Sequence, residues 1–228
     1  MSSSLDRVVA FLNTTTGRDA ATRMLQYAVK ALIWTDTAAA ASTPLGKLYA
    51  AVSMSRKVLR LSRSLALLNE VDSRVPSTDA NGRLLERARW FLHVFYIADH
   101  VIWLERLGAL AIPPRAHDFV LTVKMLTWLA RTACIGMYNA QCLARHPHLK
   151  ERLPDDDPLE EAGAVAARDF GVCSRAVVCA CLDALVIIHL LGWPGALHRI
   201  PSGLFGLLGA VSSAISLYDS ATIQEPII

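Results

Sequence analysis

A basic amphipathic segment between residues 51 and 68, AVSMSRKVLRLSRSLALL, most strongly constrains what this chain can fold into. On an α-helix its charges gather on one side, and apolar residues occupy most of the rest. No acidic residue occurs between Asp36 and Glu70, so the segment lacks the pairs of opposite charge that usually support a polar helix face in water. A wide apolar face beside an all-cationic face is typical of a helix lying in the surface of an anionic bilayer.

We therefore predict that this helix binds anionic membrane lipids. The predicted lipid-binding cations are Lys47, Arg56, Lys57, Arg60 and Arg63. The predicted membrane-inserting face comprises Met54, Val58, Leu59, Leu61, Leu65 and Leu68. Each cation near such a surface contributes on the order of 1 kcal/mol. A helix of a soluble bundle, with its polar side in water, and a nucleic acid-binding helix remain as alternatives. The net charge of only +3 argues against a chain that binds nucleic acid throughout.

The rest of the chain indicates an all-α membrane protein, with N-terminal amphipathic helices and C-terminal hydrophobic helices. Hydrophobic residues make up 53% of the sequence, which is high for a soluble domain of this size. We divide the chain into an N-terminal membrane-remodelling region (1–68), a linker (69–83), central helices (84–144), an acidic loop (145–162) and C-terminal anchoring helices (163–228). Apolar helices near 90–110 and within 176–218 are the candidate membrane anchors, although the first contains His93, Asp99 and His100.

Two short-range patterns predict local structure. Thr16 and Asp19 have the spacing of a capping box at a helix start, and Asp19 and Arg23 have the spacing of an i,i+4 ion pair. Near the C-terminus, small residues recur at every fourth position, which allows two helices to approach closely inside a membrane. These predicted helix-packing residues are Ser202, Gly206, Ala210 and Ala214.

The sequence offers no support for an enzyme. It contains neither a phosphate-binding glycine loop after a strand nor a G-x-S-x-G or H-E-x-x-H motif. We predict no catalytic residue, metal or cofactor, because histidines such as His93 and His100 are more often satisfied or interfacial than metal ligands. Asp183 lies in an apolar run. An ionisable group at membrane depth faces a wet cavity, serves a function or bonds to a neighbouring helix.

Four segments carry a family resemblance in the expected order. They are Val9–Asp19 (followed by Gln26-Tyr27), Ser55–Arg63, Ala98–Gly108 and Gly206–Tyr218. The first resembles the start of the peroxin-eleven family of peroxisomal membrane proteins, and the second resembles the amphipathic helix of that family. The chain departs from the family pattern at His100, where Asn is usual, and at Glu105, where Ser is usual.

The resemblance implies an integral protein of the peroxisomal membrane, or of the glycosomal membrane, that elongates the organelle before division. It also implies self-association into a homo-oligomer and contact with the organelle fission machinery. A shallow helix in one leaflet expands that leaflet, which favours curvature. Two alternatives stay open: a channel for small metabolites whose polar path is lined by Lys124, Arg131 and Asp183, and a soluble helical scaffold.

Overall fold

The computed structural model describes residues 4–34, 41–72, 80–150, 160–192 and 200–223, and within these ranges the ordered elements are helices. The expectation of an all-α protein is confirmed for this part of the chain. The helices are α1 (Ser4–Leu12), α2 (Thr15–Ile33), α3 (Pro44–Asp72), α4 (Ala80–Arg106), α5 (Pro114–Lys150), α6 (Glu160–Leu190) and α7 (Ser202–Ile223).

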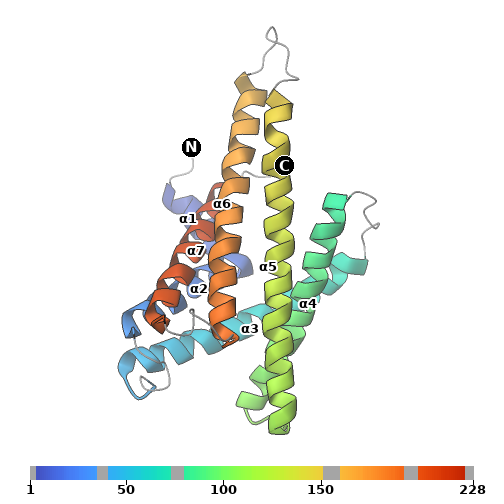
Figure 1. The fold of residues 1–228 in the computed structure, drawn as a ribbon. Helices are drawn as coiled ribbons and strands as arrows, with labels where there is room; N and C mark the ends of the chain where they lie inside the picture. The colour runs from blue at the N-terminus through green and yellow to red at the C-terminus, as the bar shows by residue number, and fades with distance from the viewer. Residues whose placement is uncertain (1–3, 35–40, 73–79, 151–159, 193–199, 224–228) are drawn as a thin grey trace.

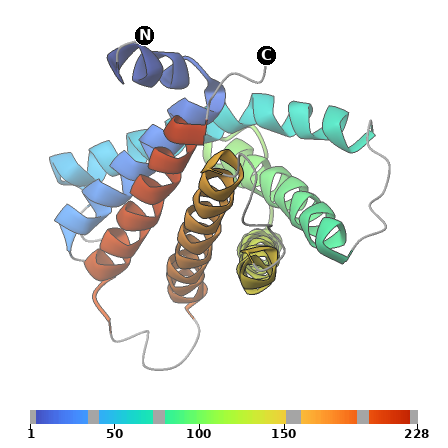
Figure 2. The same ribbon diagram turned by 90° about the horizontal axis from the view of Figure 1, so that it is seen from above.

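Six of these helices pack as a closed circuit. Helix α2 contacts α3 and α7, α7 contacts α6, α6 contacts α5, α5 contacts α4, and α4 returns to α3 (Figures 1 and 2). Short α1 packs on α2 and α7. Helices α5 and α6 lie side by side as a long pair, and α3 runs across this pair rather than along it in both views. A small apolar core of Tyr27, Val186 and Phe205 joins α2, α6 and α7.

Helix boundaries differ from the predicted ones where tertiary contacts intervene. The cap of α2 is Thr14, whose side chain accepts a hydrogen bond from Gly17 N at 2.9 Å, instead of the predicted Thr16. With Thr14 as the cap, Asp19 is five positions further along and is not at the position of a box partner; its side chain contacts cations of α3. Helix α3 continues past Leu68 to Asp72, and α5 continues to Lys150. Residues 73–79 of the predicted linker and 151–159 of the predicted acidic loop lie outside the described residues.

Two helices of the described chain are long and apolar enough to cross a membrane. They are residues Pro114–Arg145 of α5 and Phe170–Leu190 of α6, and only 11% of each apolar window is buried inside the protein. The anchor predicted near 90–110 lies in α4, which is not one of these two helices, and its role as an anchor stays a prediction. Both helices also expose an apolar stripe, formed by Phe119, Leu126 and Met137 on α5 and by Phe170, Val178 and Leu185 on α6.

Glycines of α7 make a close helix contact with α2. A Cβ placed on Gly206 would lie 2.5 Å from the backbone N of Ala31, and one on Gly209 would lie 2.4 Å from the Tyr27 ring. Only residues without a side chain allow the two helices this separation. The close contact holds α7 and α2 as one wall of the circuit.

Candidate functional site

The cations of α3 face the interior of the helix circuit. Lys57 is only 5% exposed and Arg56 only 7% exposed, while Arg60 is half-buried. We expected these side chains on an open surface beside lipid phosphates, so the structure corrects their predicted exposure; whether they bind lipid stays a prediction. Lys47 is exposed, and the side chain of Arg63 lies outside the described residues.

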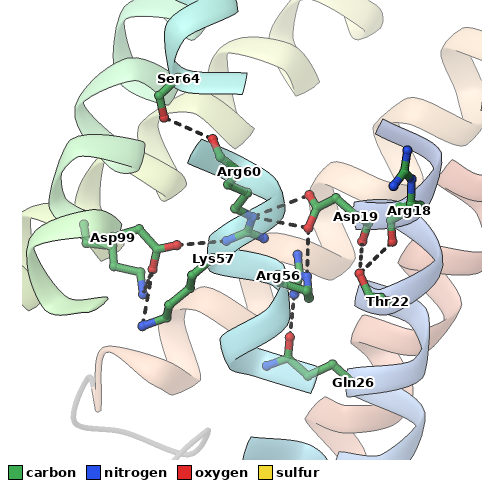
Figure 3. A network of polar contacts seen from close by, with 10 residues as sticks. Arg18, Asp19, Thr22, Gln26, Arg56, Lys57, Arg60, Ser64 and Asp99 are labelled. Atoms are coloured by element: carbon green, nitrogen blue, oxygen red, sulfur yellow. Dashed lines mark hydrogen bonds and ion pairs between the residues drawn. The ribbon is translucent and has the colours of Figure 1, made fainter. Parts of the chain in front are cut away.

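The first acidic partner of these cations is Asp19 on α2 (Figure 3). Arg56 Nε donates to Asp19 Oδ1 at 3.0 Å, and Arg60 Nε lies 3.4 Å from the same oxygen. Arg56 also donates through Nη1 to Gln26 Oε1 at 2.6 Å. One carboxylate therefore serves two guanidinium groups, and it ties α3 to α2.

The second acidic partner is Asp99 on α4, which is 2% exposed. Lys124 of α5 lies 2.7 Å from Asp99 Oδ1, Arg60 Nη1 lies 3.2 Å from Oδ2, and Lys57 Nζ lies 4.0 Å from Oδ1. Figure 3 shows Arg60 reaching both carboxylates from its position between them. Asp99 thus joins α3, α4 and α5 through three cations.

Burial and neighbouring charges together set the pKa values of these groups. Burial alone would raise the pKa of Asp99, but Lys124, Arg60 and Lys57 lower it to about 2. Burial lowers the pKa of Lys57 to about 8, because the attraction of Asp99 offsets only part of the loss of solvation. Burial and the like charge of Arg60 lower the pKa of Arg56 to about 10. The surrounding cations thus favour the charged form of Asp99, whereas acidic neighbours offset only part of the effect of burial on Lys57 and Arg56.

A cavity of about 440 Å³ opens among these side chains, and we call it the cationic cavity. It is bordered by α2, α3, α4 and α5, with Leu190 contributed by α6. The aromatic lining includes Phe95, and Arg60 and Lys124 lie over its ring at 5.6 and 5.8 Å. The charged residues of the lining are Asp19, Arg23, Lys30, Arg56, Lys57, Arg60, Asp99, Arg106, Lys124 and Arg131.

The outward side of α3 is mostly apolar. Val58 is 54% exposed and Leu61 is 47% exposed, with Leu45 and Leu48 also exposed near the start of the helix. Met54 and Leu59 are of intermediate exposure, and the side chains of Leu65 and Leu68 lie outside the described part. A helix with cations inside and apolar groups outside is the reverse of the arrangement expected in a soluble bundle.

The remaining predicted positions lie elsewhere in the fold. Lys124 and Arg131 line the cationic cavity, but Asp183 is not among its lining residues. Asp183 accepts two contacts from Arg23 Nη2, at 2.6 and 2.7 Å, and one from Ser212 Oγ at 2.6 Å. It therefore bonds to neighbouring helices, which is one of the roles left open for it. The pairing also replaces the predicted local pair between Asp19 and Arg23.

The predicted small-residue stripe is divided between two environments. Gly206 lies against α2, Ser202 and Ala210 are of intermediate exposure, and Ala214 is exposed. Gly209 packs against Tyr27 of α2 and Gly203 against Trp34, the C-cap residue of α2, but neither glycine was among the predicted helix-packing residues. Their spacing of three from Gly206 is the signal that could have identified them. The contacts of Gln26 and Asp99 with the α3 cations were not predicted either, because they join segments that are distant in the sequence.

Within the described residues, a helical fold with two helices able to cross a bilayer, exposed apolar faces and the α3 cations turned inward is consistent with an integral membrane protein. The chain belongs to the Peroxisomal biogenesis factor 11 (PEX11) family, which matches residues 5–221. It is also similar to Peroxisomal membrane protein 11B of Arabidopsis thaliana, with 28% identity over 225 residues that cover 91% of this chain and 94% of the relative. No solved structure matches it.

The family confirms the expectation drawn from the four sequence segments. The protein resides in the peroxisomal membrane and acts in the proliferation and division of peroxisomes. It belongs to a family of biogenesis factors, which is not known as a family of enzymes. A membrane location also argues against the soluble scaffold considered above.

Proposed function

We propose that the protein elongates the peroxisomal membrane by inserting the apolar outer face of α3 into the cytosolic leaflet. The observation that supports this most directly is the direction of α3, which runs across the two candidate spans α5 and α6 (Figures 1 and 2). If those helices cross the bilayer, a transverse helix lies close to the membrane plane. Its exposed residues Val58 and Leu61 then enter the boundary between headgroups and acyl chains.

Insertion at this shallow depth expands one leaflet and favours positive curvature. Exposed Lys47, at the start of α3, contributes attraction to anionic lipid. Self-association aligns many such helices, and the resulting tubule is the substrate on which the fission machinery acts. Contacts with lipid, with other copies and with fission factors are all parts of this proposal.

The test uses the full-length chain reconstituted into vesicles with and without anionic lipid, with tubulation recorded by electron microscopy. Val58→Ser/Leu61→Ser removes two half-exposed apolar side chains from α3, worth roughly 1 kcal/mol each on insertion. We expect about a tenfold or greater loss of tubulation. Leu25→Ser/Leu32→Ser is the matched control, because it removes two exposed leucines from α2. Equal tubulation by the α3 variant and the wild type would contradict the proposal.

A metabolite channel is the second candidate, because Lys124 and Arg131 of α5 both line the cationic cavity. Reversing both charges should change conductance across a planar bilayer and leave tubulation unaltered. Tubulation without conductance in the wild type would reject the channel.

A further inference from the structure

The cationic cavity has a charge composition unlike that of an ordinary protein interior. Eight basic and two acidic side chains line it; of the basic ones, Arg23 pairs with Asp183 outside the lining and Arg106 is exposed. Buried charges are normally matched by partners of opposite sign, since taking an unmatched ion out of water is costly. We propose that the cationic cavity is a binding site for a small anion that carries more than one phosphate group.

The excess charge is already clear from the four cations that contact the two carboxylates. Asp19 and Asp99 supply two negative charges to Arg56, Lys57, Arg60 and Lys124. Burial lowers the pKa of Lys57, because Asp99, at 4.0 Å from its Nζ, offsets only part of the lost solvation. An anion placed among these groups supplies the missing compensation.

Phosphate chemistry fits this set of donors better than a single carboxylate does. Arginine presents a planar fork to phosphate oxygens, and lysine adds a compact positive charge. The cations come from several helices, so groups on different sides of the cavity can hold separate phosphates. The volume of about 440 Å³ lies within the range of small-molecule sites and exceeds what one inorganic phosphate needs.

Such an anion has two sources, a free metabolite and the headgroup of a phosphorylated lipid. The cavity lies beside α3, whose opposite side is apolar. A headgroup could therefore enter from a membrane that α3 contacts, whereas a free anion would enter from water. Inositol phosphates allow both sources to be tested with the same chemical group.

The experiment uses the full-length protein in nanodiscs. In the first arm, the discs contain phosphatidylcholine alone, and inositol 1,4,5-trisphosphate is titrated by calorimetry with inorganic phosphate as a comparison. In the second arm, phosphatidylinositol 4,5-bisphosphate is included in the disc, and binding is followed as an increase in the unfolding midpoint over discs of phosphatidylcholine.

Three single substitutions probe the site. Lys57→Gln and Lys124→Gln each leave Asp99 with two other cations, and each should weaken binding by about tenfold or more. Arg106→Gln changes a lining residue that is exposed, so it preserves the fold and should weaken binding several-fold. Arg87→Gln is the matched control, because Arg87 is an exposed arginine of the same helix outside the lining.

Binding of inositol 1,4,5-trisphosphate that is weakened in the three cavity variants and unchanged in Arg87→Gln supports a site for free anions. If the cavity variants weaken binding only of phosphatidylinositol 4,5-bisphosphate in the disc, the result supports a site for a lipid headgroup. Absence of binding in both arms, or equal weakening by Arg87→Gln and Arg106→Gln, overturns the proposal. The outcome is independent of the tubulation assay, since Val58 and Leu61 do not line the cavity.

Discussion

Asp99→Asn is the substitution that most sharply tests the packing of α3. The Asp99 side chain is 2% exposed and contacts Lys57, Arg60 and Lys124 from α3 and α5. Asparagine keeps the size of the side chain at position 99 and removes its negative charge. Three cations then share a buried region in which Asp19 is the remaining carboxylate of the lining.

The size of the effect follows from the pKa of Asp99. Its fall from 3.8 to about 2 corresponds to about 2 kcal/mol of folding stability at neutral pH. Removing one partner of a buried ion pair typically costs about 3–5 kcal/mol, because the other charge stays behind. We therefore expect Asp99→Asn to lower the free energy of unfolding by about 2–4 kcal/mol. Since the folded-state pKa is depressed, this contribution is present above about pH 4 and is lost as the pH falls towards 2.

The assay is chemical denaturation of the full-length protein in detergent micelles, followed by circular dichroism between pH 2 and pH 7. Asp118→Asn is the control, because Asp118 is an exposed carboxylate on α5. Its effect should stay within about 0.5 kcal/mol. If Asp99→Asn unfolds at the same denaturant concentration as the wild type at neutral pH, the assignment of Asp99 as the junction of α3, α4 and α5 is refuted.

Two further predictions concern α7 and the charge of Lys57. Gly206→Ala should lower the free energy of unfolding by about 1–3 kcal/mol, because the new Cβ meets the backbone of Ala31; Gly171→Ala, which meets only the flexible end of Arg175, should be neutral or stabilising in the same denaturation assay. Wild-type stability should rise as the pH increases from about 8 to 10.5, since the pKa of Lys57 is depressed in the folded state. Comparison with Lys57→Gln isolates this rise, and an identical pH profile in the variant would contradict it.

The sequence predicted the cationic face of α3, but it did not predict the direction in which that face points. The spacing of Arg56, Lys57 and Arg60 placed them on one helix face, because helical periodicity is a local property. The direction of that face depends on Asp19 and Asp99, which lie far away along the chain. A helix without internal acidic residues can meet its counter-charges in lipid phosphates or in other helices. The sequence pattern favoured the first, and the structure contains the second.

The sequence by itself determined the all-α character and the membrane environment, because both depend on helical periodicity and on long apolar runs. It also carried the family resemblance in four short segments. Only the tertiary structure decided which carboxylate pairs with which cation. Asp19 pairs with Arg56 and Arg60, and Arg23 pairs with Asp183 across the fold. A local i,i+4 pair contributes only about 0.2–0.5 kcal/mol. A buried charge left without a partner costs considerably more, so helix packing governs the pairing.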